Sequence, residues 1–226
     1  MAGFRTRRKT NNQSYTGVNG TLHLPNAMKA QPYTGGFTRD GVFLYFFYNF
    51  YNGSTNVDIG LYYTGNGWHV FASGSVDYEG GWHQYDCNLS AGQTIQVAAY
   101  PQGDHVIVFK LNNTEYPFNL KSDANIWNGC YIGREMNIVP QRSPDPCYYK
   151  NTNCYFQDAL WYDTSLNKKT GGYENLSVAN SRADTDMDSG DPALFESVCV
   201  DFKHFGSGTA AVKDSATIDF RLSQLC

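Results

Sequence analysis

The densest mixture of aromatic, imidazole and carboxylate side chains lies in one glycine-broken segment, residues 77–86. Sugar binding requires flat aromatic faces for stacking, with polar groups beside them for the hydroxyls. This segment offers both, so we expect a glycan-binding surface here. Trp82 follows two glycines and is expected to be exposed, whereas Trp68 also fits a core position that closes a strand. The candidate ligand-binding residues are Asp77, Tyr78, Trp82, His83, Tyr85, Asp86 and Trp68.

Paired carboxylates for acid–base catalysis are harder to find. The five glutamates are isolated from one another in the sequence, and a retaining glycosidase needs two carboxyl groups about 5 to 5.5 Å apart. If the protein is an enzyme, Glu79 and Glu135 are the pair expected to converge. The alternative is that Glu135, next to Arg134, is an ion-paired strand residue. The chain has no G-x-S-x-G elbow, H-E-x-x-H motif, phosphate loop or dinucleotide turn.

A metal site is expected at residues 184–191, where carboxylates alternate and a glycine follows. Such a loop can surround Ca²⁺ with oxygen ligands. The spacing departs from an EF-hand because Gly190 is the seventh residue rather than the sixth. A structural Ca²⁺ is therefore one interpretation, and a solvated acidic turn is the other. The candidate ligands are Asp184, Asp186, Asp188 and Asp191.

The chain has six cysteines and no C-x-x-C pair. An even number without metal-ligand spacing favours disulfides and therefore an oxidising, extracellular or cell-surface location. The expected pairs are Cys147 with Cys154 and Cys199 with Cys226. No apolar signal-peptide core follows Met1, and no run reaches the roughly 18 apolar residues of a membrane span.

Composition predicts the elements that must position these groups. The 226 residues include 17 Tyr, 14 Phe and 22 Gly, which is typical of many strands joined by tight turns. Residues 41–71 contain two aromatic runs around Asn52-Gly53 and a third after Gly65-Asn66-Gly67, so they predict an antiparallel meander. With roughly eleven such strands and no convincing helix, we expect an all-β jelly-roll sandwich of two antiparallel sheets.

The distribution of charge limits the classes of partner and predicts how the N-terminal residues behave. A net charge of −4 gives no support for nucleic-acid binding. Four basic residues lie before the first expected strand, so residues 1–14 are interpreted as a flexible arm and residues 15–226 as one β-sandwich domain. These basic residues are Arg5, Arg7, Arg8 and Lys9.

Several strand patterns carry a resemblance to a known fold. They are VNGTLHLP, the segments Asp58 to Tyr62 and Phe156 to Trp161, Gly67-Trp68, and Ile218 to Phe220. In this order they resemble the concanavalin A-like lectin/glucanase jelly roll, and within it the uncharacterised secreted bacterial proteins of the YrpD type. The resemblance covers most of residues 18–222 and implies the fold.

The enzymes of that fold have motifs that this chain lacks. The E-x-D-x-x-E strand of the glucanases is absent, and the strand motifs of the lyases do not match. Acid peptidases built on a related sandwich use a glutamine and a glutamate. Gln96 lies on an expected strand, but no Trp-Tyr-Glu context accompanies it.

The sequence therefore favours a non-enzymatic extracellular or surface protein that binds a glycan or polysaccharide through aromatic loops. One alternative is a self-associating structural subunit, of a surface layer, fibre, spore or crystal, that uses the arm and Cys226. The other is a polysaccharide hydrolase or lyase.

Overall fold

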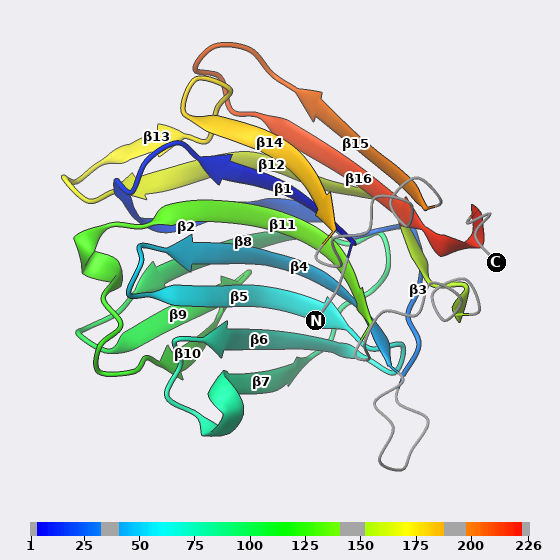
Figure 1. Ribbon diagram of the computed structural model, residues 1–226, viewed down its shortest axis with the longest axis horizontal. Coiled ribbons are helices and arrows are strands. Elements are labelled where there is room, and N and C mark those ends of the chain that lie inside the picture. Colours follow the sequence, from blue (N-terminus) through cyan, green and yellow to red (C-terminus); the bar gives the residue numbers. More distant parts are fainter. Residues whose placement is uncertain (1–3, 33–40, 141–151, 188–197, 223–226) are drawn as a thin grey trace.

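The computed structural model describes residues 4–32, 41–140, 152–187 and 198–222, and within these ranges it is a β-sandwich (Figure 1). Sixteen strands and three short 3₁₀ helices form there: η1 (Glu79–Gly81), η2 (Ile126–Asn128) and η3 (Phe220–Leu222). Every strand pairing is antiparallel, which confirms the expected fold class with more strands than the expected eleven. No helix in the described ranges is long and apolar enough to cross a membrane.

The first sheet, called sheet A, contains seven strands. Figure 1 shows them as a row of long, curved ribbons. In spatial order they are β14 (Ser181–Met187), β1 (Phe4–Thr10), β11 (Tyr131–Pro140), β4 (Val42–Tyr51), β5 (Asn56–Tyr63), β6 (Trp68–Gly74) and β7 (Trp82–Cys87).

The second sheet, called sheet B, packs against the first. Two short strands, β3 (Ala27–Lys29) and β13 (Tyr173–Asn175), pair with its long central strand β12. The other strands, in spatial order, are β10 (Thr114–Asn119), β9 (Val106–Leu111), β8 (Thr94–Pro101), β2 (Tyr15–His23), β12 (Tyr155–Lys168), β16 (Lys213–Asp219) and β15 (Cys199–Phe205).

Strand β4 is apolar on both faces. Phe46, Tyr48 and Phe50 face sheet B and belong to the main core. The alternate residues Phe43, Tyr45 and Phe47 point the other way, and they are buried by one another and by aromatic residues of β5 and β6. A continuous aromatic run is what a strand covered on both faces requires. The outer face of sheet A therefore has an aromatic cluster of its own.

Residues 4–10 are not part of a flexible arm, so the expectation of an arm over residues 1–14 is wrong for this segment. Phe4–Thr10 form β1, which lies between β14 and β11 inside sheet A. Phe4, Thr6, Arg8 and Thr10 are buried, while the residues between them are only partly buried. The sequence did not reveal this alternation, because arginine is rarely buried unless it has a partner, and Arg8 was therefore expected to be exposed. The structural-subunit alternative thereby loses its free arm.

The partner of Arg8 is a carboxylate between the sheets. Asp214 of β16 accepts from Arg8, with Nε and Oδ2 2.8 Å apart, and it also accepts from Arg134 of β11. All three side chains are at most 3% exposed. Burial acts to raise the pKa of Asp214, but the charges and hydrogen bonds of the two arginines outweigh it and lower this pKa to about 2. His204 of β15 reaches the same carboxylate, with Nδ1 and Oδ1 2.8 Å apart.

We predict that Asp214→Asn destabilises the fold by about 3–5 kcal/mol, because it leaves two buried guanidinium groups without a counter-charge. Urea unfolding followed by tryptophan fluorescence measures the loss. The control is Asp201→Asn, which removes a half-exposed carboxylate paired with Lys203 and should cost under about 1 kcal/mol. Equal effects of the two substitutions would contradict a role for Asp214 in holding the sheets together.

Candidate functional site

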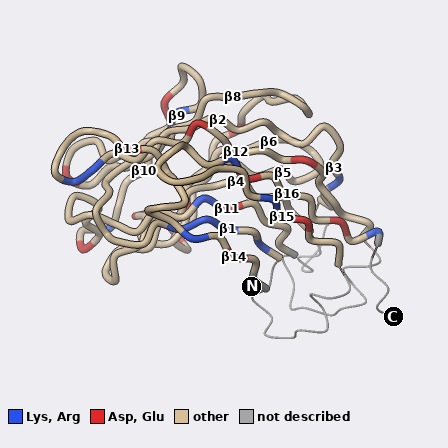
Figure 2. Tube along the Cα trace, turned by 90° about the horizontal axis from the view of Figure 1, so that it is seen from above, with Lys and Arg blue, Asp and Glu red and all other residues tan. Residues whose placement is uncertain are grey.

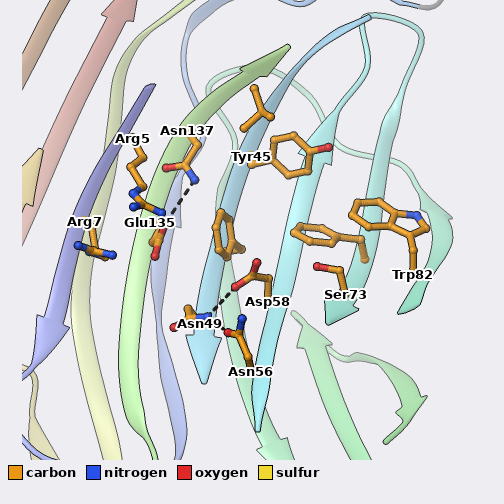
Figure 3. A pocket seen from close by; sticks show the side chains of 13 residues that line it. Arg5, Arg7, Tyr45, Asn49, Asn56, Asp58, Ser73, Trp82, Glu135 and Asn137 are labelled. Carbon is orange, nitrogen blue, oxygen red and sulfur yellow. Dashed lines mark hydrogen bonds between the residues drawn. The ribbon is translucent and has the colours of Figure 1, made fainter. Parts of the chain in front are cut away.

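A pocket of about 350 Å³ lies on the outer face of sheet A, the face turned away from sheet B. Figure 3 shows side chains from β1, β11, β4, β5, β6 and β7 around it. The aromatic part of the lining is Tyr45, Phe47, Phe71 and Trp82. The polar part includes Arg5, Arg7, Asn49, Asp58, Glu135 and Asn137.

Strand register brings these side chains together from distant parts of the chain. Arg7 is directly opposite Glu135, which is opposite Phe47. In the next row, two residues along each strand, Asn49 is opposite Asp58. Because side chains alternate between the faces of a sheet, all of these residues point to the same outer face.

Gly60 makes room for the aromatic wall of the pocket. It is opposite Phe47 on one side and Phe71 on the other. A Cβ atom at this position would lie 2.5 Å from the Cα atom of Phe47. Glycine therefore lets the two phenyl rings approach across β5, with centroids 5.9 Å apart.

Glu135 is a buried acid of the pocket. Its side chain is 4% exposed. Burial, followed by the negative charge of Asp58, raises the pKa of Glu135 to about 7, although the charges of Arg5 and Arg7 and a hydrogen bond from Asn137 oppose this shift. Glu135 therefore holds a proton up to near-neutral pH, as a carboxylic acid must in order to act as a proton donor.

Asp58 is the second carboxyl group of the pocket and accepts a hydrogen bond from Asn49. Asn49 Nδ2 donates to Asp58 Oδ1 at 2.7 Å and to Asn56 Oδ1 at 2.8 Å (Figure 3). This amide fixes the carboxylate on the same face as Glu135. The pocket thus combines a protonated acid, Glu135, with a carboxylate, Asp58, whose negative charge raises the pKa of that acid.

Asn137 places a buried amide oxygen in the pocket. Its Nδ2 donates to Glu135 Oε2 at 3.3 Å. Its Oδ1 is buried and has no hydrogen-bond partner among the described residues. A buried acceptor without a partner costs free energy, so a bound molecule or water that donates to it is favoured. The pocket is therefore equipped for a ligand that carries an N–H or O–H group.

The structure separates the two glutamates expected to converge. Glu135 lies in the pocket, whereas Glu79 is exposed on η1 and does not line it. The sequence interpretation missed Asp58 as the partner, together with Asn49 and Asn137. A pattern that could have found them is polar residues at alternate positions of otherwise aromatic strands.

The expected glycan-binding segment is divided between the two faces of the sheet. Trp82 lines the pocket and stacks on Phe71, with centroids 4.8 Å apart. His83 and Tyr85 point to the opposite face, where His83 stacks on Tyr78 at 4.1 Å.

The remaining candidates of this segment lie elsewhere. Trp68 is a core residue, and Asp77 is exposed and does not line the pocket. Asp86 is exposed and pairs with His69, with Oδ1 and Nδ1 2.9 Å apart. The period of two in β7 therefore prevents a single aromatic surface from forming here.

The acidic segment is only partly within the described residues. Asp184 lies on β14 and accepts from Arg7 through both carboxylate oxygens, each at 3.0 Å. Asp186 lies on the same strand, whereas Asp188 and Asp191 lie outside the described ranges. Within those ranges, no cluster of three metal-ligating side chains occurs. The calcium site remains an untested prediction.

The disulfide prediction is not supported. Cys154 and Cys199 are free thiols in the structure, and their expected partners Cys147 and Cys226 lie outside the described residues. Burial raises the pKa of the Cys154 thiol to about 11, which keeps it protonated and unreactive.

Several solved structures that share this fold are those of peptidases. Scytalido-glutamic peptidase with a transition state analog inhibitor matches with a TM-score of 0.53 and 15% identity, over 95% of this chain and 97% of that one. SCP-B, a member of the Eqolisin family of peptidases in a complex with the tripeptide Ala-Ile-His, matches with a TM-score of 0.52 and 15% identity over the same shares.

Other comparisons add little. An alginate lyase from Pseudomonas aeruginosa is a weaker match, with a TM-score of 0.38 over 78% of this chain and 65% of that one, too low to bear on function. No protein-family model and no curated protein matches the chain, so the resemblance to YrpD-type proteins has no support.

These findings correct the main functional interpretation of the sequence. A non-enzymatic glycan-binding protein was expected, but three solved structures that match over nearly the whole chain are those of peptidases. The aromatic loop on which that expectation rested does not form one surface. What the chain shares with these peptidases is the sandwich fold.

We predict that Glu135→Gln removes a pH dependence of stability. Folding raises the pKa of Glu135 from 4.5 to about 7, so its contribution is complete below pH 4.5 and is lost as the pH rises through 7. This loss amounts to roughly 3 kcal/mol at pH 8. Urea unfolding at pH 4.5, 6 and 8 should show a smaller decline in the variant. The exposed Glu79→Gln should keep the wild-type decline, and parallel curves for all three proteins would contradict the shift.

Proposed function

We propose that this chain is a hydrolase that cleaves peptide bonds at weakly acidic pH in the outer-face pocket. The observation that carries the proposal is the buried Glu135, whose pKa near 7 lets it donate a proton, beside the carboxylate of Asp58. A carboxylic acid that keeps its proton near neutral pH, beside a carboxylate, can serve as the acid and the base of a hydrolysis. The peptidase structures that share the fold support the substrate class.

The reaction assigns one role to each carboxyl group. Asp58 takes a proton from a water molecule as the water oxygen attacks the carbonyl carbon of the substrate. Glu135 gives its proton to the amide nitrogen as the carbon–nitrogen bond breaks. The products are a free carboxyl group and a free amine. The proton that Asp58 has gained then returns to Glu135 through solvent, which restores both groups.

Neighbouring side chains hold the reacting groups in place. Asn49 orients Asp58, and Asn137 contacts Glu135 and offers Oδ1 to an N–H group of the substrate or to the attacking water. The aromatic wall formed by Phe47, Phe71 and Trp82 excludes water from one side of the pocket. A drier pocket strengthens the electrostatic interactions inside it.

The second catalytic group differs from the glutamine of the related sandwich peptidases. Gln96, the glutamine considered from the sequence, lies on β8 in sheet B and donates to Thr21 at 2.9 Å. It does not line the pocket. In this chain Asp58 and the asparagine amides take its place beside Glu135.

A polysaccharide hydrolase is the second candidate. A pair of carboxyl groups also serves glycosidic cleavage, and the partly exposed Trp82 at the edge of the pocket provides an aromatic surface for a sugar ring. The products separate the two candidates, because peptide cleavage creates new amino termini and glycoside cleavage creates new reducing ends.

We predict that the protein cleaves a denatured protein substrate and that kcat/KM falls as the pH rises through about 7, because Glu135 then loses its proton. Glu135→Gln and Asp58→Asn should each lower kcat/KM by about 10²- to 10⁴-fold. New amino termini and new reducing ends are measured in the same digests.

The matched control for this experiment is Glu79→Gln, which changes an exposed glutamate outside the pocket and should retain wild-type activity. Release of reducing ends without new amino termini would replace the peptidase proposal with the glycosidase. Absence of both products across the pH range would overturn the hydrolase proposal.

A further inference from the structure

Two cations lie directly opposite each other beside the pocket. Lys9 of β1 is the register partner of Arg182 of β14, on the outer face of sheet A. Like charges at directly opposite positions of a sheet are destabilising. Figure 2 shows basic residues along β1 and its neighbour β11 in a chain whose net charge is −4. The Lys9–Arg182 pair therefore lowers the stability of the sheet, so a contribution to stability does not account for it.

The neighbouring acidic side chains act on Lys9 at a distance but form no direct ion pair with it. Asp184, the acid next to this pair on β14, makes two hydrogen bonds to Arg7. Among the described residues, neither Lys9 nor Arg182 forms an ion pair within 4.0 Å. Glu135 is the other nearby acid, and it is protonated at weakly acidic pH.

Lys9 is held in place by two tyrosine rings. Its Nζ atom lies 4.6 Å from the ring centroid of Tyr131 and 5.4 Å from that of Tyr51. The two tyrosines are themselves register partners on β11 and β4. Burial, followed by the positive charges of Arg7 and Arg182, lowers the pKa of Lys9, although the negative charges of Asp184 and Glu135 oppose this shift. A fixed, partly desolvated ammonium group of this kind binds a carboxylate more strongly than a free surface lysine does.

Lys9 and Arg182 lie on the same face of sheet A as the proposed catalytic groups. Lys9 belongs to the same transverse row as Asn49 and Asp58, with only Gly133 between Lys9 and Asn49. This row is two residues, about 6.5 Å, from the row that contains Glu135. A peptide held at the pocket can therefore place a carboxylate here while its scissile bond lies between Asp58 and Glu135.

We propose that Lys9 and Arg182 form a subsite that binds a carboxylate of the substrate close to the scissile bond. This inference rests on the proposed function and adds a preference to it. The carboxylate comes either from a Glu or Asp side chain or from the C-terminus of the peptide. Both sources are ionised in the weakly acidic range in which Glu135 keeps its proton.

The test compares peptides that differ only in this charge. One series places Glu or Gln at each of the three positions on either side of the cleaved bond, and a second series ends in a free carboxylate or a carboxamide. We expect the wild type to prefer one Glu peptide, or the free acid, by about tenfold in kcat/KM. Lys9→Gln and Arg182→Gln should each abolish most of this preference, while the rate on the uncharged peptides stays within about twofold.

The control variant is Lys110→Gln, which removes a lysine of β9 in sheet B that is paired with Glu115 at 3.7 Å. It should retain the full preference. Lys9→Glu, which places a carboxylate directly opposite Arg182, should also abolish the preference. Equal cleavage of Glu and Gln peptides by the wild type would overturn the subsite and leave the hydrolase proposal standing.

Binding is measured separately from cleavage. Fluorescence anisotropy of the labelled Glu and Gln peptides with the Glu135→Gln variant reports the subsite without turnover. The subsite is supported if the Glu peptide binds more tightly than the Gln peptide and an additional Lys9→Gln substitution removes this difference. This holds even if the wild type cleaves no peptide. In that case only the proposed function is overturned. Equal binding of both peptides overturns the subsite.

Discussion

The contact between Asp214 and two arginines of the opposite sheet is the interaction on which the rest of the structure depends. Arg8 and Arg134 come from adjacent strands of sheet A, and both point inward to this carboxylate of sheet B. Because strand neighbours point to opposite faces, the next residues, Lys9 and Glu135, must point outward. A slip of one residue would bury the pocket residues and expose the arginines. The buried ion pair therefore determines which side chains the pocket receives.

The two faces of sheet A have different roles in the same strands. The inner face packs against sheet B in the main apolar core, whereas the outer face combines an aromatic cluster with carboxyl, amide and basic groups. Several of these groups are costly for stability: Glu135 is buried with a raised pKa, Asn137 has an oxygen without a partner in the described part of the chain, and Lys9 is opposite Arg182. Local violations of the rules of stability concentrated at one place are typical of a functional site.

The likeness to the glutamic peptidases extends over nearly the whole chain but concerns the fold. The chemistry of a site on a shared fold has to be argued from its own residues. In this chain the acid Glu135 is accompanied by Asp58 and a set of asparagines rather than by a glutamine. The proposed activity and the proposed carboxylate subsite both follow from these side chains and from the rows into which the register places them.

The sequence by itself determined the antiparallel sandwich and the meander of β4, β5 and β6, because periodicity, aromatic content and turn residues are local properties. It also identified Glu135 and Trp82 as candidates. Only the tertiary structure decided that Asp58 accompanies Glu135, that residues 4–10 are a strand, and that Trp82 and His83 face opposite sides. These outcomes depend on register between strands far apart in the chain, such as β1 with β11. The raised pKa of Glu135 likewise depends on burial, which arises only when the strands assemble.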